Sequence, residues 1–232
     1  MPLPLPSPGS TPERWVRGLG EVFAVFDQQD SGCVSYGVRV GDERWFVKTP
    51  TTPAAVASLR SAVRFHAAVR HSAINPVLQV VAFDDAPVLV LPWLDASLLN
   101  HSTTAGRTDR AHPSSAWSRL RARPVPEVLA AVDALLSAHR AVAAAGFVEV
   151  DLYDGSLMYD FDRHTLTLID LDDYRPGPFA TGADRLPGST RFMAPEQWGG
   201  GTTIDERTMV FVLGRTMRLM LDARDDEGAW RG

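Results

Sequence analysis

The sequence predicts an α+β protein whose first part is rich in β-strands and whose second part is mostly helical. Apolar and polar residues alternate in short runs over the first 94 residues, which is typical of strands. The composition then changes to a Ser-, Thr-, Arg- and Pro-rich stretch, residues 98–126, and an Ala- and Leu-rich helical pattern follows it. With 232 residues, 45% of them hydrophobic, the chain can form one large domain or two small lobes.

The first part of the chain is predicted to contain two hairpins and one helix. Residues 1–13, in which Pro, Leu and Ser recur, are expected to form a disordered leader and do not resemble a signal peptide. Residues 34–47 alternate around a Gly-Asp turn and predict a β-hairpin. Residues 54–70 carry apolar side chains at helical spacing. Two short apolar runs, 77–83 and 87–94, predict a second, more buried hairpin.

The second part is predicted to be a helix, a hairpin and a final helix. The first helix ends where Gly146 can take the left-handed conformation common after helices. The expected elements are a helix at 127–145, a loop at 150–156, strands at 157–161 and 165–169, a Gly- and Pro-rich stretch at 175–201, and a helix at about 205–221. We therefore divide the chain into a leader (1–13), an N-lobe (14–94), a hinge and linker (95–126) and a C-lobe (127–232).

The charge and cysteine content exclude several partners and sites. A net charge of -5 provides no basic surface for nucleic acid or for an anionic membrane. The most apolar stretch, residues 77–94, is interrupted by two aspartates and two prolines, so no membrane span is expected. The single cysteine, Cys33, forms no disulfide within the chain and suits a reducing cytoplasm. Of 23 basic residues only Lys48 is a lysine.

Two acidic clusters lie on either side of the predicted hairpin at 157–169. Asp151 and Asp154 precede it, and Asp170, Asp172 and Asp173 follow it. Because a hairpin folds back on itself, the loop before its first strand and the end of its second strand should lie side by side. Carboxylates from both places could then bind one Mg²⁺ together with substrate phosphates. The alternative is a pair of solvated acidic turns.

Six segments, in order along the chain, resemble the motifs of the protein kinase-like superfamily, including a set of small bacterial kinase-like proteins. The most specific of them resembles the end of a kinase activation segment. The segments are 30–38, 45–48, 146–151, 168–172, 188–196 and 205–214. The resemblance covers about residues 30–221. It implies a bilobal protein kinase-like fold, with a β-rich N-lobe and a mostly helical, shortened C-lobe.

The resemblance also implies a catalytic role for two residues and a metal-binding role for three. Asp151 corresponds to the catalytic aspartate, which orients the acceptor hydroxyl and accepts its proton. Lys48 corresponds to the lysine that binds the ATP phosphates. Asp170 corresponds to the Mg²⁺ ligand, and Ser156 stands where the family has a metal-binding Asn. If residues 170–172 are extended, Asp172 faces the same side as Asp170 and adds a second carboxylate.

Further residues are assigned by the same resemblance to nucleotide binding and to structural support. Gly32 and Val34 belong to a degenerate glycine-rich loop and the strand after it. Leu91, Trp93 and Leu94 belong to the adenine slot and hinge. Glu196 and Asp205 are the supporting residues, Asp205 as the aspartate that braces the catalytic loop. The arginine that normally pairs with a glutamate at position 196 would lie beyond the last predicted helix.

Two further departures from the family pattern change what we expect. The 54–70 helix has Ser61 and Ala62 where the family pairs a glutamate with the lysine, so Lys48 contacts nucleotide and Asp170 alone or uses another polar residue such as His66. Glu149 and Val150 replace a His-Arg pair. Without that arginine no cation receives an activation-segment phosphate, and we expect activity without phosphorylation of the three hydroxyl residues of this segment, Thr181, Ser189 and Thr190.

The sequence therefore predicts an ATP- and Mg²⁺-dependent enzyme of Ser/Thr protein kinase type, with a hydroxyl-bearing protein or small molecule as acceptor. Tyr153, where such kinases place a lysine, favours a small-molecule phosphotransferase of the antibiotic-modifying type as the alternative. A pseudokinase that binds nucleotide without turnover is the third. The short C-lobe is either natural or the result of a truncated chain, and an uncovered apolar face there would favour dimerisation.

Overall fold

The computed structural model describes residues 3–222, apart from residues 30, 85, 104, 105, 108, 183–185 and 187. The protein is a mixed α+β protein, as the sequence predicts, and it divides into two compact units. The first comprises residues 1–68, 75–95 and 103–106, and the second comprises residues 69–74, 96–102 and 107–232. Within the described part of the chain, no helix is long and apolar enough to cross a membrane.

The first unit is built on a five-stranded antiparallel sheet of order β1-β2-β3-β5-β4. Both predicted hairpins are present, with ends shifted by a few residues, and Gly41 takes a φ of 61° in the first turn. The strand β1 was not predicted. The strands are β1 (Glu21–Phe26), β2 (Cys33–Val40), β3 (Glu43–Pro50), β4 (Gln79–Phe83) and β5 (Ala86–Pro92).

Helix α1 (Pro12–Leu19) packs on one face of this sheet, and Thr11 caps it by accepting a hydrogen bond from the Arg14 amide. The residues before it are also packed. Leu3 is buried in the same hydrophobic cluster as Trp15, and its backbone is hydrogen-bonded to the Gln79 side chain. The expectation of a disordered leader is therefore wrong for residues 3–13. The reason lies in partners that are distant in the sequence, among them Gln79, 76 positions away, and local composition does not contain them.

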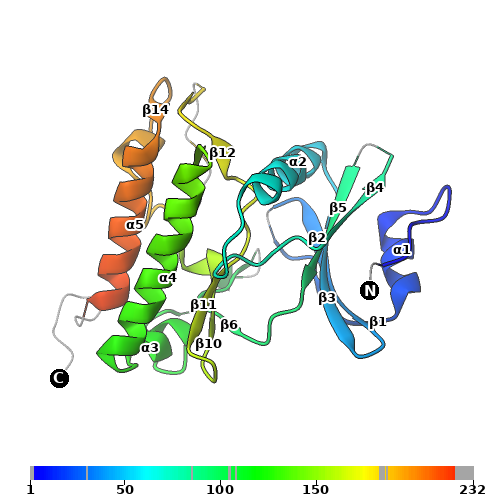
Figure 1. The fold of residues 1–232 in the computed structure, drawn as a ribbon, viewed down its shortest axis with the longest axis horizontal. Coiled ribbons are helices and arrows are strands. Elements are labelled where there is room, and N and C mark those ends of the chain that lie inside the picture. The colour runs from blue at the N-terminus through cyan, green and yellow to red at the C-terminus, as the bar shows by residue number, and fades with distance from the viewer. Residues whose placement is uncertain are drawn as a thin grey trace. The chain divides into compact units, whose positions relative to one another are not determined.

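Helix α2 (Pro53–Ala68) covers the opposite face of the sheet, as Figure 1 shows in cyan. Its buried residues Ala55, Leu59 and Ala62 pack with Cys33 of β2 and Leu89 of β5. The helical spacing of apolar residues predicts this element correctly. The two faces of the sheet thus have separate hydrophobic clusters, one with α1 and one with α2.

The second unit contains helices α3 (Ala116–Arg121), α4 (Val125–Ala144) and α5 (Glu206–Leu221). Helices α4 and α5 lie side by side and antiparallel (Figure 1). Both were predicted. Helix α4 is followed by Gly146 with a φ of 73°, as expected for a residue beyond a helix C-terminus. Helix α5 begins after Asp205, whose side chain accepts a hydrogen bond from the Arg207 amide.

The predicted hairpin of the second unit consists of β10 (Leu157–Asp160) and β11 (Thr165–Leu168), and β11 packs against α4. The strand β6 (Ser97–Leu98) adds to its other edge. Because β6 and α3 lie within residues 95–126, that segment is more structured than the linker we expected. The remaining short elements are β7 (Ser102–Thr103), β8 (Gly106–Arg107), β9 (Phe147–Val148), β12 (Arg175–Pro176), β13 (Phe179–Ala180), β14 (Thr203–Ile204), and 3₁₀ turns at Asp154–Ser156 and Pro195–Gln197.

Candidate active site

Lys48 lies near the middle of the sheet in the first unit. It pairs with Ser35 on β2 and with Leu89 on β5, and it is buried. Residues that pair directly across antiparallel strands share a face. Lys48 therefore lies on the α2 face of the sheet, together with Ser35 and Leu89. A buried ammonium on a rigid strand is held in a defined place, which is what binding a phosphate group requires.

Val34 does not lie on the same face as Lys48. It packs with Tyr36, Val38 and the α1 cluster on the other side of the sheet. Side chains alternate between faces along a strand, so one ligand cannot lie against both Val34 and Lys48. The assignment of Val34 to nucleotide binding is wrong in this geometry. Cys33 and Ser35, its neighbours on β2, occupy the face that carries Lys48.

Gly32 has a structural reason to be glycine. Its φ is 66°, and a Cβ at this position would lie 2.5 Å from the Thr52 Oγ1. Its carbonyl oxygen accepts hydrogen bonds from the Thr51 amide at 2.9 Å and from the Thr51 hydroxyl at 2.8 Å. Gly32 thus joins the start of β2 to the start of α2. Asp30, the first residue of the predicted phosphate-covering loop, lies outside the described residues.

Three predicted hinge residues lie at or just after the end of β5. Leu91 pairs with Phe46 and packs with the α2 cluster, so it shares the face of Lys48. The Trp93 amide donates a hydrogen bond of 3.0 Å to the Arg44 carbonyl, which continues the β3–β5 pairing beyond the strand. Leu94 is half-buried. Leu91 and Lys48 therefore present side chains on one face, as nucleotide binding would require.

An aromatic cluster that sequence reasoning missed surrounds Trp93. The Trp93 ring lies 4.8 Å from that of Phe23 and 6.3 Å from that of Phe26, and the Phe26 ring lies 6.0 Å from that of Phe46. Gly37 makes room for it, because a Cβ there would lie 2.8 Å from Trp93. All four rings are half-buried. The bulge in β1 that turns Phe23 toward this cluster had no visible signal in the sequence.

Asp151 lies in the second unit, in the loop between β9 and the 3₁₀ turn Asp154–Ser156. Its carboxylate accepts a hydrogen bond of 3.3 Å from the Ser189 amide. A Cβ on Gly188 would lie only 3.4 Å from the same Asp151 oxygen. The segment 188–196, which carries the most specific resemblance, therefore contacts the residue predicted to be catalytic.

Ser156 connects the two acidic loops. Its hydroxyl donates a hydrogen bond of 3.3 Å to the Asp151 carbonyl, and its own carbonyl accepts one of 2.9 Å from the Ile169 amide. Leu157 pairs with Leu168 in the adjoining hairpin. The prediction that the two ends of this hairpin lie side by side is thus confirmed. The buried Ser156 hydroxyl is engaged by backbone, and its assignment as a metal ligand stays a prediction.

Asp170 has a left-handed backbone, with a φ of 58°. This conformation is uncommon for residues other than glycine, and such outliers concentrate at functional sites. It also means that residues 170–172 are not extended, so the geometric argument for Asp172 as a second carboxylate ligand is wrong. The assignment of Asp170 as an Mg²⁺ ligand stays a prediction; in proteins, one or two carboxylates together with substrate phosphates commonly hold this cation.

Asp154 is paired with a cation, Arg110. It is fully buried and forms a bidentate ion pair with Arg110, whose Nη2 donates to Asp154 Oδ1 at 2.9 Å. Asp154 is therefore a buried, ion-paired loop aspartate and not part of a solvated acidic turn. Within the described ranges, no group of three or more His, Cys, Asp or Glu side chains lies close enough to hold a metal.

Glu149 is fully buried two residues before Asp151. Its Oε1 accepts a hydrogen bond from the Leu152 amide, whereas its Oε2 has no hydrogen-bond partner. Burial raises the pKa of Glu149 to about 8, the nearby Asp151 raises it further, and the Leu152 amide opposes the shift. The carboxyl group is therefore uncharged at neutral pH.

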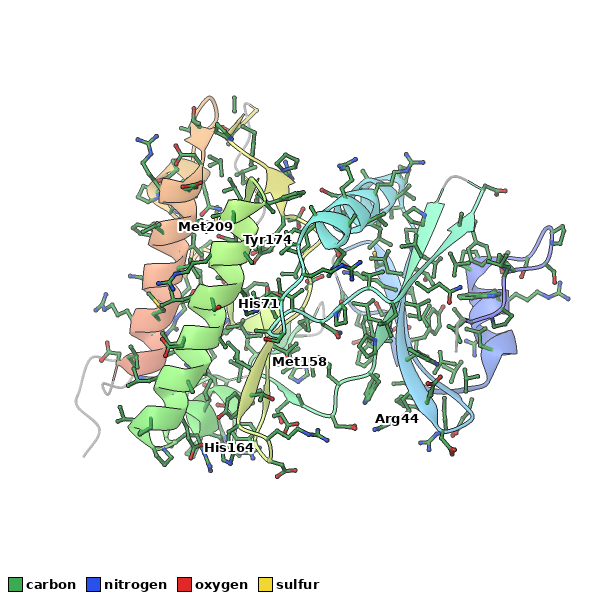
Figure 2. The ribbon with its side chains drawn as sticks, in the orientation of Figure 1. Arg44, His71, Met158, His164, Tyr174 and Met209 are labelled. Carbon is green, nitrogen blue, oxygen red and sulfur yellow. The ribbon has the colours of Figure 1, made fainter. Side chains whose placement is uncertain are left out.

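A second buried polar pair is formed by His139 on α4 and Tyr174. Figure 2 labels Tyr174 beside α4. His139 Nδ1 lies 2.9 Å from the Leu135 carbonyl, so it carries the proton, and Nε2 accepts a 2.9 Å hydrogen bond from the Tyr174 hydroxyl. Burial lowers the pKa of His139 to about 4, against the effect of Leu135. Burial, Glu149 and Asp151 raise the pKa of Tyr174 well above its usual value. Both groups are neutral at physiological pH.

Of the two predicted supporting residues, Asp205 does not act as the resemblance implies. Asp205 accepts hydrogen bonds from the Arg207 amide and guanidinium, within its own helix turn, and does not brace the catalytic loop. The free amides at a helix N-terminus explain this, since they are the nearest donors. Glu196 accepts a 2.7 Å hydrogen bond from the Thr208 hydroxyl. The contact with the loop comes instead from Gln197, which sequence reasoning missed.

Gln197 is fully buried and holds two backbone groups. Its Nε2 donates a 2.7 Å hydrogen bond to the Val150 carbonyl, and its Oε1 accepts one of 2.7 Å from the Ala194 amide. It thus ties the segment 188–196 to the loop of Asp151. A polar residue directly after the Ala-Pro-Glu sequence was the only available signal.

Comparison with protein-family models and with curated proteins provides no independent assignment. No protein-family model matches this sequence, and no curated protein is significantly similar to it. The function is therefore argued from the geometry of these residues.

Proposed function

We propose that this protein is an ATP-dependent phosphotransferase with a bilobal protein kinase-like fold, which transfers the γ-phosphoryl group to a hydroxyl acceptor. One observation carries the proposal. Ser156 is hydrogen-bonded both to the Asp151 backbone and to the backbone just before Asp170, so a carboxylate suited to proton transfer and one suited to metal binding belong to one connected structure. Phosphoryl transfer depends mainly on this kind of positioning.

The chemical roles follow from the residue types. Asp151 orients the acceptor hydroxyl and accepts its proton while the acceptor oxygen bonds to the γ-phosphorus and the bond to the bridging oxygen of ADP breaks. Lys48 binds nucleotide phosphates, and Asp170 holds Mg²⁺ together with phosphate oxygens. Mg²⁺, when bound, neutralises phosphate charge. Leu91 and the half-buried aromatic cluster around Trp93 provide apolar surface suited to the base.

The acceptor is proposed to be a protein Ser or Thr side chain. The contact between Asp151 and the Gly188–Ser189 backbone supports this, because it puts an activation-like segment beside the proposed base. Tyr153 and the acidic run at 169–173 favour the alternative, a small-molecule phosphotransferase. The structural role of Gly32 and the absence of Val34 from the Lys48 face favour the pseudokinase.

The test is incubation with γ-labelled ATP and Mg²⁺, with and without a generic protein acceptor and a panel of hydroxylated small molecules. We expect label on the protein acceptor, and loss of labelling in Asp151→Asn. Asp162→Asn is the matched control, because Asp162 is an exposed aspartate in the turn of the neighbouring hairpin. Label on a small molecule would support the alternative. ATP-induced thermal stabilisation without any turnover would contradict the proposal and favour a pseudokinase.

A further inference from the structure

The buried carboxyl group of Glu149 has no role in the chemistry described above. Glu149 belongs to the loop that carries Asp151. Its Oε1 accepts a hydrogen bond from the Leu152 amide of the same loop. This bond joins the residue two before Asp151 to the residue directly after it. It therefore closes the backbone around Asp151 into a short ring.

The other carboxyl oxygen of Glu149 shows which protonation state the fold accommodates. Oε2 is buried without a partner, and a charged carboxylate in that position would lose its hydration with nothing to replace it. An uncharged acid costs much less to bury. The raised pKa of Glu149 is consistent with this geometry.

Within the described part of the chain, no cation is among the groups that shift the pKa of Glu149. Asp151 is the titratable neighbour that acts on Glu149 electrostatically. Glu149 in turn raises the pKa of Tyr174, whose hydroxyl is already donated to the neutral His139 on α4. The Pro195–Gln197 turn contacts this loop through the Gln197 side chain, which donates a hydrogen bond to the Val150 carbonyl and carries no charge. A negative charge on Glu149 would thus face a second negative charge, on Asp151, in a buried setting.

We propose that Glu149 is a positioning residue that, as an uncharged acid, holds the Leu152 amide and thereby fixes the backbone that carries Asp151. When Glu149 loses its proton, the buried charge and its repulsion by Asp151 open this ring, and the loop becomes mobile while the rest of the second unit stays folded. The consequence for turnover rests on the proposed function, but the consequence for the loop does not.

The direct test is amide hydrogen exchange, followed residue by residue by NMR at pH 6.5 and pH 9 and corrected for intrinsic exchange rates. The protein is compared with Glu149→Gln, which keeps a neutral acceptor oxygen, and with Glu149→Ala. Glu206→Gln is the matched control, since Glu206 is exposed in the same unit. The Leu135 amide on α4 serves as the reference for global unfolding.

At pH 6.5 we expect the Leu152 amide to be equally protected in the unmodified protein and in Glu149→Gln. At pH 9 the unmodified protein and Glu206→Gln should lose more than tenfold in protection at Leu152, because the ionised fraction of a group with a pKa of about 8 rises from about 3% at pH 6.5 to about 90% at pH 9. Glu149→Gln should keep it, and Leu135 should be unaffected. The proposal would be overturned if protection of the Leu152 amide depended on pH equally in the unmodified protein and in Glu149→Gln. A loss of protection at Leu135 parallel to that at Leu152 would overturn it as well.

Two further readouts keep the test decisive. If Glu149→Ala does not fold, the comparison of Glu149→Gln with the unmodified protein across pH still decides. In an active preparation, kcat should fall through a single ionisation near pH 8 that is missing in Glu149→Gln, with little change in the KM for ATP. If no turnover is found, the proposed function fails while the exchange experiment still supports or overturns the positioning role.

Discussion

The Gln197 side chain donates a 2.7 Å hydrogen bond to the carbonyl oxygen of Val150, the residue directly before Asp151. In the same loop, Glu149 Oε1 accepts a hydrogen bond from the Leu152 amide, and the Ser156 hydroxyl donates one to the Asp151 carbonyl. Side chains therefore hold three consecutive backbone positions, 150 to 152. Such anchoring is a requirement for a catalytic base, which must hold its position to within a fraction of an ångström.

Replacing Gln197 by Ala should destabilise the protein by about 1–3 kcal/mol, because two buried backbone groups, on Val150 and Ala194, lose their partner. The free energy of unfolding in urea is the measurement. Gln29→Ala, at an exposed loop position, is the control and should change stability by less than about 0.5 kcal/mol. Equal stabilities of the two variants would show that the Gln197 hydrogen bonds carry no net energy.

Asp154→Asn should lower stability by about 3 kcal/mol or more, because it leaves the Arg110 guanidinium, which is mostly buried, without its counter-charge. The loss should be the same with and without Mg²⁺. Asp170→Asn should instead leave apo-protein stability nearly unchanged and abolish any stabilisation by Mg²⁺ with nucleotide. Thermal unfolding with and without both ligands separates the two roles. A Mg²⁺-dependent effect of Asp154→Asn would mean that Asp154 is a ligand after all.

Stability should fall as pH rises from about 6.5 to 8. The folded-state pKa of Glu149, about 8, lies above its ordinary value of 4.5, so the folded protein binds one proton more than the unfolded chain in this window. One such proton changes the free energy of unfolding by about 1.4 kcal/mol per pH unit. Urea unfolding at intervals of half a pH unit measures the slope. Glu149→Gln should reduce it by about that amount, and an unchanged slope would contradict the prediction.

His139 has the opposite effect in a different pH range. Its folded-state pKa of about 4 lies below its ordinary value of 6.5, so the neutral form stabilises the fold above pH 6.5. That contribution is lost as pH falls toward 4. We expect His139→Gln to weaken the fall in stability between pH 6.5 and 4, measured by the same unfolding experiment. His112→Gln, at an exposed position, should leave the acid limb of the curve as it is.

Lys48→Arg should lower ATP affinity at least tenfold. The guanidinium is longer and planar, and Lys48 is buried on a strand between Ser35 and Leu89, where a larger head group cannot reproduce the position of the ammonium. Isothermal titration with ATP and Mg²⁺ measures the change. Arg39→Lys, at an exposed position on β2, is the reciprocal control. Full affinity and turnover in Lys48→Arg would mean that the only lysine in the chain has no special role.

Activity should persist after phosphatase treatment. Thr181 is buried, and its hydroxyl is hydrogen-bonded to Thr202, so it is a poor target for modification. Ser189 contacts Asp151 through its amide and needs no phosphate to do so. Turnover of treated and untreated protein is compared, with phosphate content verified by mass spectrometry. A form that becomes active only after phosphorylation would contradict this expectation.

Much of the secondary structure and part of the site could be predicted from the sequence, because both depend on local patterns. Apolar periodicity located α2, α4, α5 and the three predicted hairpins within a few residues. The adjacency of the Asp151 loop and the strand end before Asp170 followed from the hairpin between them, since a hairpin brings its own ends together. The α+β class followed from the order of these elements.

Partners distant in the sequence could not be predicted. The pairing of β2 with β3 puts Lys48 opposite Ser35 and so turns Val34 to the other face, a choice that a shift of one residue would reverse. Arg110 neutralises Asp154 from 44 positions away, and Leu3 packs beside Gln79.

The sequence by itself thus determined which residues could do chemistry and which local elements carry them. Only the tertiary structure decided which of these residues are already ion-paired or hydrogen-bonded to other parts of the chain. Asp154 is paired with Arg110, Asp205 caps its own helix, and Gln197 and Glu149 hold the loop of Asp151. The physical reason is that a buried polar group takes the nearest partner that satisfies it, and which partner is nearest depends on how the whole chain packs.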